Sequence, residues 1–504
     1  MRQIAILLAL LVLVPRLGAS PRVVLLSIDG GSDAILDRLL ASGALKGGFF
    51  ERAMHRGAVA ESMTPAAVSS TPVSHPTLFT GTWPSTHGIT GPAALGDDLS
   101  ADLKSAFALP TAVPRIWSLA QEAGKRVVCI AAPGAEATSP QSTCTENAPF
   151  NAIANAPAGV SKPGTPLLAR MGPSPGEPGG PLVTKGEISE EEYVLREERF
   201  ADYIGSAVRM ELGRRDWDLL ITYIPMMDGL EHRYLLVDPR QVEYGDEEGK
   251  RRARFAQFIE RGYRKLDAIL GAWLAKSPET DFIIVSDHGM VPTHSLLLLN
   301  NALAAGGLRA GGNDAEVRAV FTGGSAEVYV NAKSRFAHGT VADADVPAVV
   351  AKVVDILRAL RDPVTGRPIL RTIASGGELG ALHLQNPSAG DVYVAAEPGW
   401  ALTGRYDPAV PLIVPNTLSP DARERVSRSP AEHEFLEKGA NNELSAGVHG
   451  HQPGDPRTQA IFYAIGPDIP HRKLPTIAMV DVAPTVLRIL GIPAPGFMNG
   501  RAVF

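Results

Sequence analysis

The chain has 504 residues and carries 48 Lys and Arg against 54 Asp and Glu, which gives a net charge of −6. This balance excludes the broad basic surface that general nucleic-acid binding requires. The length exceeds what one ordinary core can bury, so we expect one large domain with an insertion, or two to three domains.

The first residues have the pattern of a secretory signal. Arg2 supplies a positive charge, residues 4–14 are apolar, and Leu17, Gly18 and Ala19 form a small-residue cleavage site. A membrane anchor is the alternative, but the apolar run is short for a bilayer span and no later run of ~20 apolar residues follows. We therefore predict a signal peptide over residues 1–20 and an exported chain, periplasmic or secreted, with no stable membrane span.

Apolar, β-branched runs predict buried strands. They cover residues 23–28, 126–131, 218–223, 282–286 and 460–465. Amphipathic patterns predict helices over residues 32–42, 114–123, 191–213, 253–274 and 479–490. This alternation predicts an α/β fold with a mostly parallel central sheet and helices on both faces.

Two segments differ from this pattern. Residues 151–190 are rich in Pro and Gly and predict a long excursion. Residues 300–440 alternate like half-buried strands, contain an amphipathic helix, and have few catalytic-type residues at strand ends. We predict that residues 301–440 form an inserted, smaller α+β cap, and that residues 21–300 and 441–504 form the core.

The chain has two cysteines, Cys129 and Cys144. In an oxidising compartment they could pair and close a short loop, whereas the alternative is two buried free thiols. The spacing alone does not decide, although the export signal favours a bridge.

Acidic and histidine side chains follow the C-terminal ends of the predicted strands. Asp29 follows the first strand, Asp228 and His232 follow the third as D-G-L-E-H, and Asp287 and His288 follow the fourth as S-D-H-G. Open α/β sheets build their sites at this edge. The D-x-x-x-H spacing places two ligands one helical turn apart on one face.

Two further residues complete the set. His449 stands in V-H-G-H before the last strand, and Thr71 stands where a helix is expected to begin, in a segment crowded with hydroxyl groups. Imidazole and carboxylate ligands suit zinc, and this set could fill two four-coordinate sites. Two ions ~3.5–4 Å apart can clamp the attacking and leaving oxygens of a phosphoryl transfer. Ser69 and Ser70 are rival nucleophiles.

Together these motifs resemble the nucleotide pyrophosphatase/phosphodiesterase (type I phosphodiesterase) branch of the alkaline phosphatase superfamily. The resemblance rests on L-L-S-I-D-G, T-P-V-S-H-P-T-L-F-T-G-T-W-P-S-T-H-G-I, M-D-G-L-E-H, V-S-D-H-G-M, H-G-H-Q-P and V-D-V-A-P-T-V-L-R-I-L-G-I-P, which are spread over residues 23–495. It therefore covers nearly the whole chain after the predicted signal.

The resemblance implies two zinc ions per chain and a phospho-threonine intermediate. It assigns Asp29, Asp287 and His288 to one ion, with Thr71 as nucleophile, and Asp228, His232 and His449 to the other.

One position departs from the family: Pro92 in H-G-I-T-G-P replaces an Asn that donates to a phosphoryl oxygen. Proline offers no side-chain donor and no backbone N–H.

The resemblance thus predicts an exported zinc hydrolase of small-molecule phosphate esters, with phosphodiesters or pyrophosphate-linked nucleotides first. A phosphomonoesterase or phosphonate hydrolase of the same superfamily is the alternative, followed by a non-catalytic secreted binding protein that kept the fold.

For the remaining polar side chains we expect structural roles. We expect His75 and His87 to bond to the backbone, His451 to be an exposed neighbour of His449, and the acidic run 187–198 to be solvated.

Overall fold

The computed structural model describes residues 21–96, 98–99, 103–135, 144–159, 165–312, 314–321, 323–439 and 444–504. The predicted signal peptide, residues 1–20, lies outside the described residues. Across these ranges, every helix is too short or too polar to cross a lipid bilayer.

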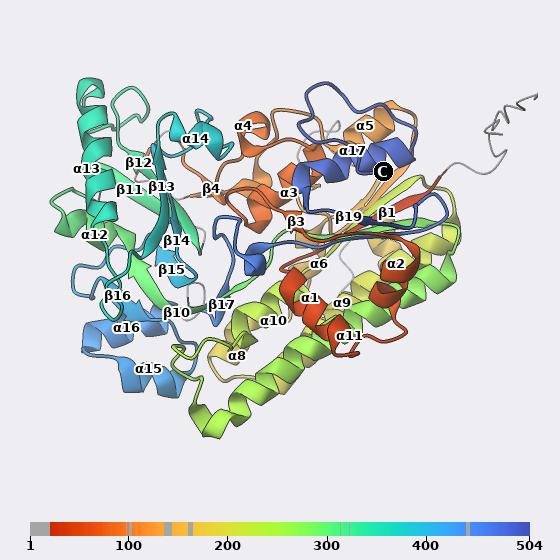
Figure 1. Cartoon of the computed structure of the whole chain (residues 1–504), viewed down its shortest axis with the longest axis horizontal. Coiled ribbons are helices and arrows are strands. Elements are labelled where there is room, and N and C mark those ends of the chain that lie inside the picture. Colours follow the sequence, from red (N-terminus) through yellow and green to blue (C-terminus); the bar gives the residue numbers. More distant parts are fainter. Residues whose placement is uncertain are drawn as a thin grey trace, which may run out of the picture.

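A mostly parallel sheet forms the centre of the core, as predicted (Figure 1). Within the described residues its strand order is β19-β2-β18-β9-β1-β8-β6-β7. The strands are β1 (Val23–Ile28), β2 (Ala58–Ala60), β6 (Val127–Ile130), β7 (Glu146–Ala148), β8 (Leu219–Ile224), β9 (Asp281–Ser286), β18 (Phe462–Ile465) and β19 (Arg472–Leu474). The run from β9 to β7 is parallel, and β18 is antiparallel to β9.

Helices cover both faces of this sheet because its strands are apolar on both sides. Val24, Leu26 and Ile28 pack on one face and Val23 and Leu25 on the other. The first face carries α1 (Asp33–Ala41), α2 (Phe49–Arg56), α9 (Glu190–Arg214) and α11 (Lys250–Lys276), and the second carries α3 (Thr71–Thr80), α5 (Ile116–Glu122) and α17 (Val482–Ile489). Figure 1 shows α5 and α17 on the opposite side of the sheet from α9 and α11.

A smaller α+β unit lies beside the core (Figure 1). One antiparallel sheet has the order β11 (Val317–Phe321), β12 (Ser325–Val330), β14 (Val392–Ala396) and β13 (Leu370–Ser375), and α13 (Val346–Arg358) packs on it. A second sheet joins β10 (Val291–Leu298) to β15 (Gly399–Thr403), β16 (Ile413–Pro415) and β17 (Gly447–Val448). Since β10 and β17 lie outside residues 301–440, the second sheet links the predicted cap to the core.

Short elements fill the connections. The helices are α4 (Pro84–His87), α6 (Phe150–Ala154), α7 (Pro166–Met171), α8 (Gly180–Thr184), α10 (Met226–Tyr234), α12 (Leu299–Ala305), α14 (Glu378–Ala381), α15 (Pro420–Val426) and α16 (Pro430–Gly439). The strands are β3 (Met63–Thr64), β4 (Ala93–Ala94), β5 (Lys104–Ser105) and β20 (Ile477–Ala478). Three of these helices, α6 to α8, lie in the Pro- and Gly-rich excursion.

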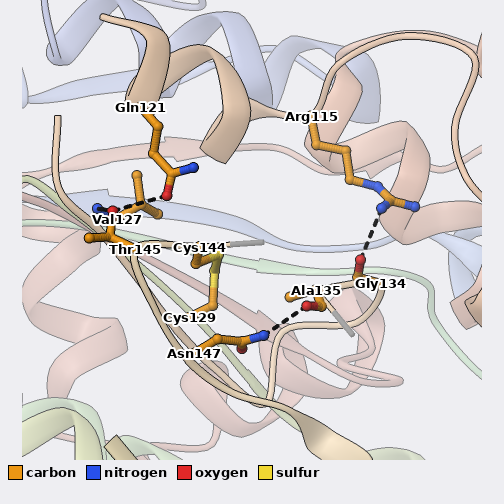
Figure 2. The surroundings of a disulfide bond; sticks show 9 residues. All are labelled: Arg115, Gln121, Val127, Cys129, Gly134, Ala135, Cys144, Thr145 and Asn147. Atoms are coloured by element: carbon orange, nitrogen blue, oxygen red, sulfur yellow. Dashed lines mark hydrogen bonds between the residues drawn. A yellow bond between two sulfur atoms is a disulfide. The ribbon is translucent and has the colours of Figure 1, made fainter. Parts of the chain in front are cut away.

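The two cysteines form a disulfide at the edge of the central sheet (Figure 2). Cys129 lies in β6 and Cys144 lies just before β7, with their Cα atoms 5.9 Å apart. Beside the bridge, Asn147 Nδ2 donates a hydrogen bond of 2.7 Å to the Ala135 carbonyl. The bridge connects β6 to a residue just before the edge strand β7, and the hydrogen bond connects β7 to the segment after β6.

We expect the double variant Cys129→Ala/Cys144→Ala to lose about 3 kcal/mol of unfolding free energy, because closing a loop of about 15 residues restricts the unfolded chain by that amount. Urea unfolding of the oxidised protein and of the variant measures the difference. Dithiothreitol should destabilise the wild type and leave the variant unchanged. Equal unfolding midpoints for oxidised and reduced wild type would contradict the prediction.

Candidate functional site

The site lies where three neighbouring strands end. Ile28 of β1 is in register with Ile224 of β8 and with Ser286 of β9, so the next residues of each strand emerge side by side. Asp29 and Asp287 follow directly, and the backbone N–H of Gly30 donates to Asp287 Oδ1 at 3.1 Å. A side chain at position 30 would place its Cβ 2.9 Å from the Asp228 Cα, and φ there is +68°. The glycine therefore lets these loops approach each other.

Thr71, the first residue of α3, lies against the first group of acidic and histidine side chains. Its Oγ1 donates to Asp29 Oδ1 at 3.2 Å and lies 3.2 Å from His288 Nε2. His288 Nε2 is also 3.2 Å from Asp29 Oδ1 and 3.3 Å from Asp287 Oδ2. One hydroxyl, one imidazole and two carboxylates thus converge on a single point.

The rival hydroxyl groups lie differently. Ser69 Oγ donates to the His451 carbonyl at 2.7 Å. Ser70 Oγ is buried and has no hydrogen-bond partner among the described residues. Of the three consecutive hydroxyls, the contacts place that of Thr71 against the carboxylates.

Asp228 and His232 form the start of a second group, because α10 presents both on one face. His232 Nε2 lies 3.1 Å from Asp228 Oδ1, and His449 Nε2 lies 3.7 Å from the same oxygen. His232 Nδ1 donates to the Gly447 carbonyl at 2.7 Å. That bond fixes the proton on Nδ1 and leaves Nε2 with a lone pair for a metal ion.

The two groups touch through their histidines. The His288 and His449 rings stack with centroids 3.9 Å apart. Pairing of Val291 with Val448 explains this, because β10 begins just after His288 and β17 ends just before His449.

Side-chain ligand atoms lie within 4.8 Å of one another in two sets, Asp29 with Asp287 and His288, and Asp228 with His288 and His449. The first set is the one assigned from sequence. The second contains His288 where the sequence assignment had His232, and His232 Nε2 lies 3.1 Å from Asp228 Oδ1.

This donor set fits divalent metal ions. Asp287 Oδ2 and Asp228 Oδ1 are buried and accept no hydrogen bond from the described residues. A buried carboxylate oxygen that accepts no hydrogen bond is costly in a protein interior, and a bound cation would remove that cost. Carboxylate and imidazole ligands in this arrangement suit zinc.

Electrostatics at the site also favour a cation. Burial would raise the pKa of Asp29, but hydrogen bonding and charge from His288, with help from Tyr223, hold it well below its usual range. Burial and the Asp29 charge raise the pKa of Asp287 well above its usual value. Burial lowers the pKa of His288, yet Asp287 and Asp29 outweigh it and raise that pKa to about 10. The carboxylates thus favour a positive charge beside them.

Three histidines near the site have structural contacts. His75 bonds through Nδ1 to the Thr71 carbonyl at 2.9 Å and through Nε2 to Ser27 Oγ at 3.0 Å. His87 Nδ1 accepts from the backbone N–H of Ile89 at 3.2 Å. His451, which we expected to be exposed, is 2% exposed, so that prediction is wrong. Its Nε2 donates to a carbonyl of the neighbouring α+β unit, and this contact covers it.

Tyr223 is a site residue that sequence reasoning missed. Its hydroxyl donates to Asp29 Oδ2, on the carboxylate that also contacts Thr71. Its ring packs edge-on against His75 and Phe150, with centroids 5.3 and 5.5 Å away. The position in β8, in register with Ser27, was the available signal, but an aromatic residue in a buried strand is usually core.

Comparison with known proteins gives one family and one fold. The family model described as type I phosphodiesterase / nucleotide pyrophosphatase matches residues 23–430. An inactive threonine-to-alanine variant of murine ectonucleotide pyrophosphatase/phosphodiesterase 5, in complex with AMP, is similar with a TM-score of 0.59. The murine protein without that change and the human protein give 0.57 and 0.55. Each is 16% identical, over 95% of this chain and 97% of the other.

At this identity the structural likeness shows the fold alone. None of the curated proteins compared with the chain matches it.

We expect Tyr223→Phe to weaken metal binding by about 10- to 100-fold, because it removes a hydrogen bond that orients Asp29 while keeping the packed ring. Zinc titration of the metal-free protein measures the affinity. Tyr203→Phe is the matched control, since it removes one hydroxyl bond of 2.9 Å, to the Gly172 carbonyl, outside the site. Equal zinc affinity for the two variants would show that Tyr223 does not orient Asp29.

Proposed function

The chain belongs to the type I phosphodiesterase / nucleotide pyrophosphatase family, and from that premise we propose that it is an exported, zinc-dependent hydrolase of small-molecule phosphodiesters, nucleotides included, with Thr71 as nucleophile. One observation carries the proposal: Thr71 Oγ1 lies 3.2 Å from both Asp29 Oδ1 and His288 Nε2. The family assignment confirms the resemblance seen in the motifs.

Two ligand sets are proposed for the metal ions. Asp29, Asp287 and His288 would hold one ion beside Thr71, and Asp228, His232 and His449 would hold the other. Zinc in these sites would lower the pKa of the Thr71 hydroxyl and stabilise the charge on the leaving oxygen.

The residues of the chain then have separate roles. The deprotonated Thr71 Oγ1 would bond to phosphorus as the bond between phosphorus and the oxygen of the leaving alcohol breaks. Water would then attack the phosphorus of the phospho-threonine, and the bond to Oγ1 would break, which releases the phosphate product and restores threonine. The start of α3 adds the positive end of a helix dipole beside the phosphoryl group.

Solvent exposure indicates the path of the leaving group. The side chains of Asp29, Asp287 and His288 are 5%, 0% and 0% exposed. Those of Asp228 and His232 are 23% and 32% exposed, and that of His449 is 18% exposed. We therefore infer that the leaving group departs, and water arrives, on the side of Asp228, His232 and His449.

Diesters are the proposed substrates, and monoesters or phosphonates are the alternative. A relative of the same fold binds AMP and is inactive when a threonine is replaced by alanine, which supports a nucleotide and a threonine nucleophile. Pro92 opposes a standard phosphoryl site, because loss of one oxyanion donor costs on the order of 10²–10³ in rate. We propose that the cap, residues 301–440, sets the preference.

We expect two zinc ions per chain, with complete loss of hydrolysis after chelation and recovery on adding zinc. Elemental analysis, with hydrolysis of bis-(p-nitrophenyl) phosphate beside p-nitrophenyl phosphate, measures both. A folded protein that hydrolyses the esters equally well without metal would contradict the proposal. One that neither binds zinc nor turns over either ester would favour the non-catalytic binding protein.

Thr71→Ala should reduce hydrolysis of the preferred ester by at least about 10³-fold, because the nucleophile is lost. Metal content should change little, since the carboxylates and imidazoles remain. Ser70→Ala is the matched control, as it removes a neighbouring buried hydroxyl without a partner in the described chain. Full turnover by Thr71→Ala, or its loss in Ser70→Ala alone, would move the nucleophile elsewhere.

A further inference from the structure

The loop that carries His449 is attached to the segment just before the nucleophile. The backbone N–H of Gly450 donates to the Ser69 carbonyl at 2.9 Å. In return, Ser69 Oγ donates to the His451 carbonyl at 2.7 Å. Ser69 is two residues before Thr71, so this pair of bonds sets the spacing between the His449 loop and the start of α3.

The other side of the same loop is attached to the α+β unit. In the turn between β11 and β12, the backbone N–H of Gly324 donates to the His449 carbonyl at 2.8 Å. His451 Nε2 donates to the carbonyl of Trp400, in β15, at 3.0 Å. The loop is thus held between the α+β unit and the nucleophile segment.

The turn itself is fixed within the α+β unit. The Gly323 carbonyl accepts from Leu402 N at 2.7 Å, and the Gly324 carbonyl accepts from Ala396 N at 2.8 Å. These two hydrogen bonds restrict movement of the turn away from the His449 loop.

Close packing makes both glycines necessary. A Cβ on Gly324 would overlap His451 Nδ1 and lie 2.5 Å from the His451 backbone nitrogen. A Cβ on Gly323 would lie 2.7 Å from the His449 carbonyl oxygen. Any side chain on the turn would therefore push the His449 loop away from it.

We propose that His451 and the Gly323–Gly324 turn are positioning residues that hold His449 in the metal centre, so that the α+β unit completes the site rather than only covering it. The inference rests on the proposed function. Because the His449 ring stacks on His288 at 3.9 Å, a displacement of the His449 loop reaches both metal-binding groups. Since Ser69 is bonded to the same loop, the displacement also reaches the nucleophile segment.

Gly324→Ala tests the inference. We expect the zinc content to fall from two ions to one per chain, or zinc affinity to weaken by about 10- to 100-fold, with a matching loss of kcat. Gly377→Ala is the control in the same unit, because no atom lies within 4 Å of its added Cβ and its φ of −63° suits alanine. The control should keep both zinc ions and full kcat.

His451 variants give a second test that does not depend on how well Gly324→Ala folds. His451→Ala loses the bond to the Trp400 carbonyl and should weaken zinc binding, whereas His451→Gln keeps an amide donor and should recover part of it. A merely structural role would lower thermal stability in both without this difference in zinc affinity.

The outcomes separate the two proposals. Wild-type zinc binding and turnover, with unchanged zinc affinity in Gly324→Ala and His451→Ala, would overturn this inference and leave the proposed function standing. A wild type that binds zinc without hydrolysing either ester would remove the proposed activity, and the zinc affinities would still decide the positioning role. A wild type that binds no zinc would overturn both.

Discussion

Repulsion between buried carboxylates is the constraint on which this structure depends. The register of β1 and β9 brings Asp29 and Asp287 out of the sheet side by side, 5% and 0% exposed, with Asp228 close behind on α10. Like charges at such depth raise the free energy of the folded state unless a positive charge lies among them. Despite burial, Asp287 and Asp29 raise the pKa of His288 to about 10, which favours a positively charged imidazole beside them. A divalent cation bound in this pocket would offset the repulsion between the carboxylates and so stabilise the folded state.

The surrounding residues keep the carboxylates together against that repulsion. The N–H of Gly30 donates to Asp287, and the Tyr223 hydroxyl donates to Asp29. His75 reaches from the Thr71 carbonyl to Ser27 in β1, so the start of α3 is tied to the strand that Asp29 follows. The position of Thr71, the proposed nucleophile, is therefore fixed by a buried layer of hydrogen bonds, which are stronger in a low-dielectric interior than on the surface.

Sequence alone predicted the parts of this arrangement that follow from local pattern. Continuous apolar runs gave the parallel strands, and strand ends in such sheets collect functional side chains, which singled out Asp29 and Asp287. It did not predict contacts between segments far apart in the chain. Burial of His451 depends on the Trp400 carbonyl, about fifty residues earlier. Glu197, within an acidic run expected to be solvated, is buried because its side of α9 packs on the core; it accepts a bond of 2.6 Å from Tyr193 in the same helix, and burial raises its pKa to about 8.

The same long-range contacts explain why the α+β unit cannot be treated as an accessory. Its second sheet includes β10, which begins just after His288, and β17, which ends just before His449. Each strand thus lies next to a histidine of the candidate site, and the later residues of β10 pair with β15 and β16 of the inserted unit. A rigid-body movement of the α+β unit would therefore displace His288 and His449 together.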